Sequence, residues 1–227
     1  MSLKQIVTID GPSGVGKSTI SRKVAAALGF TYLDTGAMYR AVGLALSRSG
    51  VDYGNDSKVE LILDQLMIEL LSAKGKDEEV GVLLNGEDIS EVIRTPEASM
   101  LASRASSLLP VRSHLTRLQQ QIGAAERIVA EGRDTGTVVF PEAAYKFYLD
   151  AEPHERARRR IAQLKASGSD VDQDTVLALI IKRDQQDTER TIAPLKKAED
   201  ARCIDTTRLT IDQVVSAILK EIPLPIR

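Results

Sequence analysis

The residues whose types and spacing predict chemistry most clearly follow the apolar run Ile6 to Ile9. They match the pattern G-x-x-x-x-G-K-[ST], with a strand-like stretch before it and a helical pattern after it. Glycines let successive backbone N–H groups converge on one anion, and the helix that follows adds the positive end of its dipole. A chance glycine turn before a helix is the alternative. We expect this loop to bind nucleotide phosphates through Gly11, Pro12, Ser13, Gly14, Val15, Gly16, Lys17, Ser18 and Thr19.

Two side chains at the end of the loop have separate predicted tasks. Lys17 is placed to reach the β- and γ-phosphates of a nucleoside triphosphate, and the Ser18 hydroxyl is placed to bind Mg²⁺. The loop alone does not distinguish an ATPase, a GTPase and a small-molecule kinase. The N/T-K-x-D segment with which GTPases read their base is missing from the sequence. We expect ATP as a phosphoryl donor, together with Mg²⁺.

Arginines and carboxylates gather at three further places. Arg40 lies one helical turn beyond Asp34-Thr35-Gly36, and Glu131-Gly132-Arg133-Asp134 follows another strand-like run. Each group alone is also what surface ion pairs would look like. Together with the phosphate loop, they favour a kinase that binds two phosphorylated molecules. The third group occupies one helix face, at positions i, i+4 and i+7: Arg183, Asp187 and Arg190.

The elements that must position these residues alternate between strand and helix. Val82 to Leu84, followed by Asn85-Gly86, predicts a β-hairpin inserted into this alternation. The pattern predicts an α/β fold, in which helices flank a parallel sheet and a small antiparallel element is added. Strands are expected at 6–9, 30–33, 128–130, 146–149 and 202–204, and helices at 17–28, 36–48, 59–71, 97–107, 111–123, 153–166, 173–189 and 211–222.

Composition and charge are those of a soluble globular protein. Of the 227 residues, 27% are charged and 43% are hydrophobic, and the formal net charge is −2. This balance argues against a general nucleic-acid binder. Neither a signal peptide nor an apolar run near the roughly 18 residues of a membrane span is recognisable, so we expect a cytoplasmic protein. The single cysteine, Cys203, excludes an internal disulfide and is expected to be a small buried side chain in a late strand.

Five segments, in order and spacing, resemble bacterial cytidylate kinase: GPSGVGKST, LDTGAMYR, LLNGEDIS-x-x-IRT, EGRDTGTVVFP and RDQQDTERTIAPLKKAEDA. The resemblance covers residues from about 5 to 222. It implies a P-loop nucleoside monophosphate kinase with a small inserted nucleotide-monophosphate-binding subdomain, which contains a short antiparallel sheet, and with a short helical lid. It also implies transfer of the γ-phosphoryl group of ATP to CMP or dCMP, a requirement for Mg²⁺, and a monomer.

The resemblance further implies a role for each matching residue. Thr35 and Arg40 would contact the acceptor nucleotide, with Arg40 on its phosphate. Arg133 would also bind this phosphate and, with Arg190, would neutralise charge near the transferring group. The remaining contacts divide between the cytosine base, which would be read by Ser103, Arg112 and Asp134, and the pentose, which would meet Arg183 and Asp187.

Two residues depart from the family pattern, and two have alternative interpretations. The family often has Ser at the position of Thr35 and Asp at that of Glu131; the longer Glu131 would reach further toward metal-bound water. Ser103 lies in a small-residue helix and could simply allow close packing. Arg112 could be only a solvated start to a helix.

The arginine-rich helix near 153–166 is the predicted lid. Arg156 and Arg160 share a helix face and Arg159 lies one turn from Arg156. We expect Arg156 and Arg159 to contact ATP and Arg160 to reach the transferring phosphate, with Gly168 as a candidate hinge. The alternative is an ordinary solvated helix, with its arginines paired to Glu152 and Glu155. His114 and His154 are expected to be solvated helix residues with no catalytic role.

The predicted organisation is a single kinase domain. Its core comprises about 1–56, 101–152 and 175–227, the monophosphate-binding insert about 57–100, and the lid about 153–174. Other functions remain open at this level. One is a P-loop kinase for another nucleoside monophosphate, shikimate or dephospho-coenzyme A, and another is a nucleotide-dependent regulatory or nucleic-acid-binding protein.

Overall fold

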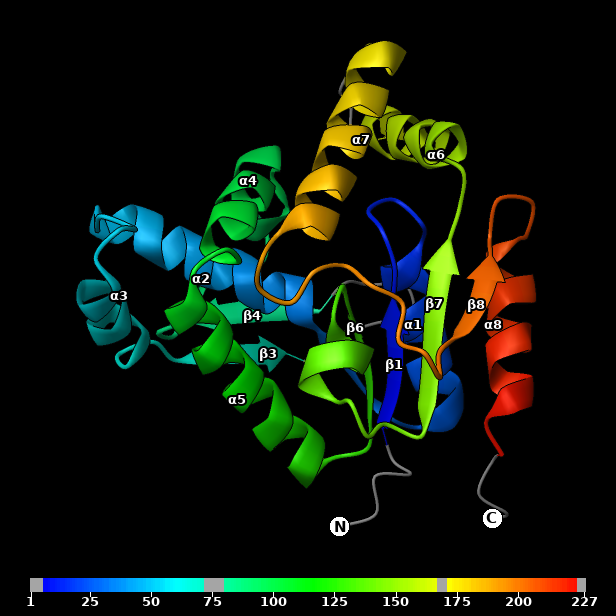
Figure 1. Cartoon of the computed structure of the whole chain (residues 1–227), viewed down its shortest axis with the longest axis horizontal. Helices are drawn as coiled ribbons and strands as arrows, with labels where there is room; N and C mark the ends of the chain where they lie inside the picture. Colours follow the sequence, from blue (N-terminus) through cyan, green and yellow to red (C-terminus); the bar gives the residue numbers. More distant parts are fainter. Residues whose placement is uncertain (1–5, 72–79, 167–170, 224–227) are drawn as a thin grey trace. The chain divides into compact units, whose positions relative to one another are not determined.

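A computed structural model describes residues 6–71, 80–166 and 171–223 (Figure 1). Its strands are β1 (Ile6–Asp10), β2 (Thr31–Asp34), β3 (Ile68–Leu71), β4 (Gly81–Leu84), β5 (Glu87–Asp88), β6 (Ile128–Gly132), β7 (Tyr145–Asp150) and β8 (Arg202–Asp205). Its α-helices are α1 (Lys17–Leu28), α2 (Thr35–Ser49), α3 (Asp56–Leu63), α4 (Pro96–Ala105), α5 (Leu109–Ala125), α6 (Pro153–Ala166), α7 (Gln173–Glu189) and α8 (Ile211–Glu221). Two short turns add a 3₁₀ helix, η2 (Val92–Arg94), and a π-helical turn, η3 (Thr135–Val139).

The chain divides into two compact units. The first comprises Met1–Tyr32 and Arg127–Arg227, and the second comprises Leu33–Glu126. The second unit contains the predicted insert, residues 57–100, and extends beyond it at both ends. The assignment of that insert to monophosphate binding, and of 153–174 to a lid, stays a prediction.

A five-stranded sheet with the strand order β2-β6-β1-β7-β8 confirms the predicted α/β class. β1 pairs in parallel with β6 on one side and β7 on the other, and β7 pairs in parallel with β8. Every residue of β1 and β6 is buried, as expected for central parallel strands that read as continuous apolar runs. α1 and α8 pack against this sheet through a core that includes Val24, Ile218 and Leu149.

The phosphate loop and the arginine-rich helix belong to the same end of the first unit. α6 and α7 pack together through Ala157, Val176 and Ile180. Figure 1 shows this helix pair beyond the carboxyl ends of β1 and β7, at the end where the loop after β1 lies. Side chains at strand ends and on α6 and α7 can therefore meet.

The second unit is built on a small antiparallel sheet with the order β3-β4-β5. The predicted hairpin is confirmed, because β4 and β5 pair antiparallel and both Asn85 and Gly86 have positive φ. The predicted helix at 59–71 is wrong over its second half. Ile68 to Leu71 form β3, which pairs with β4 in the register Ile68↔Leu84. This pairing satisfies the backbone of β3, and its short apolar run suits a strand as well as a helix.

One further prediction, the burial of Cys203 in the first unit, is wrong. Cys203 was expected to be buried, but it is exposed, because β8 is the last strand of the sheet. Among the residues that the structure describes, no helix has the length and apolar character to cross a bilayer.

Replacing Gly43 with alanine should lower the free energy of unfolding by about 1–3 kcal/mol. A Cβ atom at this position would lie 2.7 Å from the carbonyl carbon of Leu101 and 2.9 Å from the amide nitrogen of Ala102. Both atoms are backbone, so α2 and α4 would have to separate. We expect that cost to exceed the gain in helix propensity of about 1 kcal/mol.

Urea unfolding of the two proteins measures this difference. Ser47→Ala, at an exposed position of the same helix, is the matched control and should change the free energy of unfolding by less than about 0.5 kcal/mol. A Gly43→Ala variant as stable as the unaltered chain would show that the two helices separate without cost.

Candidate active site

The loop after β1 has the backbone geometry of a phosphate cradle. Gly11 has φ +150°, and a Cβ there would lie 2.1 Å from the carbonyl oxygen of Leu149, so only glycine fits. Gly14 and Gly16 also have positive φ, and α1 starts directly afterwards at Lys17. The loop thus leads into the amino end of a twelve-residue helix, where backbone N–H groups and the dipole favour an anion.

Lys17 is buried at the start of α1, with its Nζ donating to the carbonyl oxygen of Pro12 at 2.6 Å. Burial, helped by the positive charge of Arg133, lowers the pKa of Lys17 well below its ordinary value, while Glu131 opposes the shift. Arg183 also contributes to this lowering. These effects mean that the three cations are close enough to interact, as a site for a polyanion requires.

Ser18 and Glu131 form an oxygen pair beside Lys17. The Ser18 Oγ donates to Glu131 Oε1 at 2.7 Å; Ser18 is exposed and Glu131 is buried at the end of β6. A hydroxyl and a carboxylate are hard oxygen ligands of the kind Mg²⁺ prefers. The residues therefore fit the predicted metal, with the serine oxygen accessible and the carboxylate behind it.

A partly buried ionic network joins the turn after β6 to α7 and to Arg190, which directly follows α7. Arg133 Nε donates to Asp187 Oδ2 at 2.7 Å, and Arg190 donates to Asp134 Oδ1 at 3.2 Å. A second contact of 3.8 Å links Arg190 to Asp187 Oδ1. Burial by itself raises the pKa of Asp187, but the charges of Arg133, Arg183 and Arg190 outweigh it and hold this pKa below its ordinary value. The two sequence motifs predicted to act together thus meet in the first unit.

The lid arginines have different surroundings. Arg156 is buried: its Nε donates to Ala151 O at 2.9 Å, and its guanidinium donates to Ser13 O at 3.1 Å and pairs with Asp184. This contact ties α6 to the phosphate loop rather than leaving Arg156 on a solvated face.

The other two lid arginines are half-buried. Arg159 pairs with Glu155 and donates to Thr206 O at 2.6 Å, while Arg160 donates to Gln163 at 3.4 Å. Hydrogen bonds from Arg158 and Arg159 lower the pKa of Glu155 to about 2. The alternative of a solvated helix predicted that arginines of this helix pair with Glu155, and Arg158 and Arg159 do so. Contacts of all three predicted lid arginines with ATP stay predictions, and Gly168 lies outside the described residues.

The second unit positions the other predicted acceptor contacts. Asp34 caps α2 by accepting from Ala37 N at 2.8 Å and also accepts from Arg40 at 3.1 Å. Thr35, the first residue of α2, is buried, and the Nε atom of Arg40 has no hydrogen-bond partner among the described residues. This network holds Arg40 at the start of the helix.

Ser103 and Arg112 occupy two other helices of the second unit. Ser103 is half-buried in α4. Arg112 is buried in the first turn of α5, donates to Ser106 O at 2.7 Å and stacks over the ring of Tyr39 at 5.4 Å. The alternative of a solvated helix start is wrong for Arg112, because α5 and α2 enclose its side chain.

His114 also lies on α5. It is half-buried, and burial together with the positive charge of Arg117 lowers its pKa.

Three hydrogen-bonding residues near the site could not be assigned a role from the sequence. Asp10, the last residue of β1, accepts from Thr135 N at 2.9 Å and Gly136 N at 2.7 Å and so anchors the turn after Arg133. Asp184 accepts from Ser13 N at 3.4 Å, and Tyr32 donates to Glu131 at 2.7 Å. Asp10 had one usable signal, its place at a strand end before the glycine loop, whereas the other two depend on distant partners.

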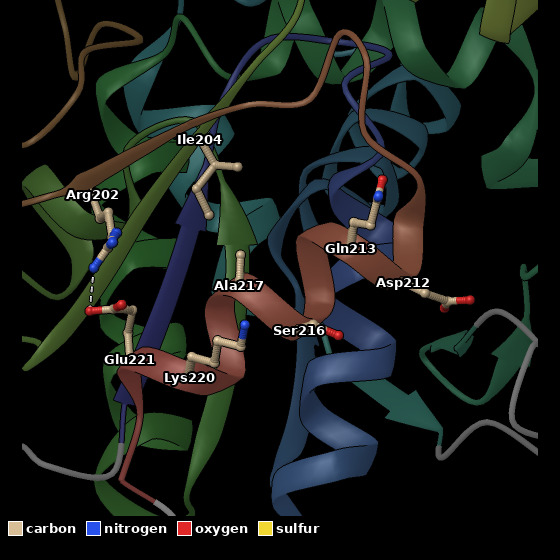
Figure 2. Close-up of a pocket in the computed structure, with 8 residues that line it drawn as sticks. All are labelled: Arg202, Ile204, Asp212, Gln213, Ser216, Ala217, Lys220 and Glu221. Carbon is tan, nitrogen blue, oxygen red and sulfur yellow. Dashed lines mark ion pairs between the residues drawn. The ribbon is translucent and has the colours of Figure 1, made fainter.

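A surface cavity of about 460 Å³ lies between β8 and α8 (Figure 2). Arg202 and Glu221 form an ion pair at one end of it, and Gln213 and Ser216 line it from α8. None of its lining residues belongs to the phosphate loop or the ionic network, so it is separate from the candidate active site.

A parallel α/β sheet whose first strand leads into this loop, with Lys17 and Ser18 at the start of the next helix, defines a P-loop nucleotide-binding protein. The family model for cytidylate kinase matches residues 7–224. The chain is 48% identical over 220 residues to a cytidylate kinase from Syntrophotalea carbinolica, covering 97% of this chain and 92% of that protein. It therefore belongs to the cytidylate kinase family.

Two further comparisons agree. A cytidylate kinase from Carboxydothermus hydrogenoformans is 46% identical over 214 residues, with 94% of this chain and 95% of that protein covered. Among solved structures, an uncharacterized protein from Eubacterium ventriosum matches with a TM-score of 0.53 at 14% identity, covering 96% of this chain and 97% of that chain. This last likeness supports the fold alone.

Proposed function

We propose that the chain transfers the γ-phosphoryl group of ATP to CMP or dCMP, giving ADP with CDP or dCDP. The observation that carries this proposal is the position of Lys17, buried at the start of α1 directly after the glycine loop, in the same unit as the ionic network of Arg133, Asp187 and Arg190. Membership of the cytidylate kinase family supports the choice of acceptor.

Phosphoryl transfer requires in-line placement and cations around the charged oxygens of the transferring group. Lys17, Arg133 and Arg190 supply positive charge, and Asp187 and Asp134 hold the two arginines in fixed directions. The acceptor phosphate is already ionised at neutral pH, so no general base is assigned. Bound Mg²⁺ supplies further charge neutralisation, and Ser18, with Glu131 behind it, would hold it.

We also propose a role in acceptor binding for residues of the second unit. Arg40 binds the phosphate of CMP, Thr35 contacts the nucleotide, and Ser103 and Arg112 read the cytosine. The buried, stacked setting of Arg112 supports a fixed guanidinium of this kind. We further propose that α6 and the start of α7 act as a lid, and that the protein is a cytoplasmic monomer.

A coupled assay of ADP release with ATP and Mg²⁺ tests the proposal. CMP, dCMP, UMP, AMP, GMP, shikimate and dephospho-coenzyme A are offered separately. Turnover on CMP and dCMP alone supports both the reaction and the cytosine-reading residues. Turnover on another monophosphate would retain the kinase and reject those residues, and turnover on none would remove the proposed acceptor class.

A further inference from the structure

Glu131 Oε1 accepts two hydrogen bonds from different elements. One comes from Ser18 Oγ at the start of α1 and the other from Tyr32 OH on β2, each at 2.7 Å. An ionised carboxylate has no proton to give, so both hydroxyls donate to it. The two donors occupy the two lone pairs of one oxygen, and Glu131 as a whole is only 4% exposed.

The direction of the Ser18 proton follows from this contact. A serine hydroxyl has one proton and rotates freely unless an acceptor fixes it. Because the proton points to Glu131, the lone pairs of Ser18 Oγ point elsewhere, and the residue is exposed. The Glu131 rotamer therefore controls how the Ser18 oxygen presents itself to a cation.

Glutamate has several rotatable side-chain bonds, and holding it in one rotamer costs entropy. Tyr32 is well suited to reduce that freedom. Tyr32 is half-buried and packs against the hydrophobic core, so its hydroxyl is held by a stiff aromatic side chain with two rotatable bonds. Ser18, in contrast, has a small side chain at a surface position and cannot anchor the carboxylate alone.

We propose that Tyr32 is a positioning residue: it fixes the Glu131 carboxylate so that Ser18 presents its lone pairs to the Mg²⁺ of a bound nucleotide. The inference rests on the proposed function, because that function supplies the nucleotide and the cation. Tyr32 touches neither the substrate nor the metal in this arrangement and acts only through Glu131.

Tyr32→Phe removes the hydroxyl and keeps the ring. Calorimetry should show that the variant binds MgADP about fivefold more weakly, the effect of one net hydrogen bond. Its affinity for ADP in the presence of EDTA should stay within about twofold, since the phosphate loop is unchanged. Tyr145→Phe is the matched control: this ring packs against the same core, and its hydroxyl has no hydrogen bond among the described residues.

A double-mutant cycle tests whether Tyr32 affects Mg²⁺ binding through Ser18. In a Ser18→Ala background, Tyr32→Phe should leave the ratio of MgADP to ADP affinity unchanged. A further fall in that ratio would contradict the route through Ser18. Equal weakening of MgADP and metal-free ADP, or no change in either, would overturn the role of Tyr32.

The kinase assay of the unaltered chain separates this inference from the function on which it rests. If the unaltered chain does not phosphorylate CMP, the proposed function fails whatever the binding ratio of the variants. If the unaltered chain is active and Tyr32→Phe behaves like Tyr145→Phe in the binding experiment, only the inference fails.

Discussion

Replacing Lys17 with alanine should lower kcat for CMP phosphorylation by about 10²- to 10³-fold, the usual cost of removing one preorganised group that stabilises developing charge. Lys17 is buried at the head of α1, beside the loop that would hold the β- and γ-phosphates. Water cannot replace its charge there as effectively as on the surface. Steady-state kinetics with saturating ATP and CMP measures the effect.

Lys23→Ala is the matched control. This lysine lies on the same helix but pairs with Asp212 at an exposed position. Its removal should change kcat by less than about twofold, as expected for a surface ion pair. Thermal melting of both variants shows whether loss of the buried contact from Lys17 to Pro12 O has unfolded the chain. A folded Lys17→Ala protein with full activity would refute the assignment of the phosphate loop.

Arg133→Ala should lower kcat/KM for CMP by about 10²-fold or more, while the affinity for ATP changes by no more than about threefold. Arg133 is held by Asp187 at 2.7 Å, so its guanidinium is preorganised for an anion. We place that anion at the acceptor phosphate. Kinetics with varied CMP, together with calorimetry of ATP binding, separates the two affinities.

Two further variants sharpen the test. Arg133→Lys keeps the charge but loses the planar fork, and should recover only part of the activity. Arg127→Ala removes an exposed arginine that stacks over Phe30 and should leave both affinities unchanged. Equal losses of CMP and ATP affinity in Arg133→Ala would contradict the placement of Arg133 at the acceptor.

The network around Asp187 extends this prediction to stability. Because three arginines hold the pKa of Asp187 below its ordinary value, its charge stabilises the fold above the unfolded-state pKa. This contribution is lost as the pH falls through the folded-state pKa. The expected loss in acid should therefore be smaller in Arg133→Ala, which comparison of urea unfolding at neutral and acidic pH can measure.

The phosphate loop could be recognised from sequence because its requirements are local. Gly11 to Ser18 must form one backbone turn between a strand and a helix, and eight consecutive residues specify that turn. Central strands such as β1 and β6 were also predictable, because burial on both faces favours a nearly continuous run of apolar and β-branched residues. The conformation of Ile68–Leu71 was not, since only its pairing with β4 distinguishes a strand from a helix.

The site residues divide in the same way. Sequence identified Lys17, Ser18, Arg133 and Asp187 as types and positions suited to phosphate chemistry. Only tertiary structure brought Tyr32 to Glu131, 99 residues away, and buried Arg156 against Ser13, 143 residues away. A local turn is specified by neighbouring residues, whereas the partner of a buried polar group depends on which strands and helices pack together. That packing is a property of the whole chain, and no short segment specifies it.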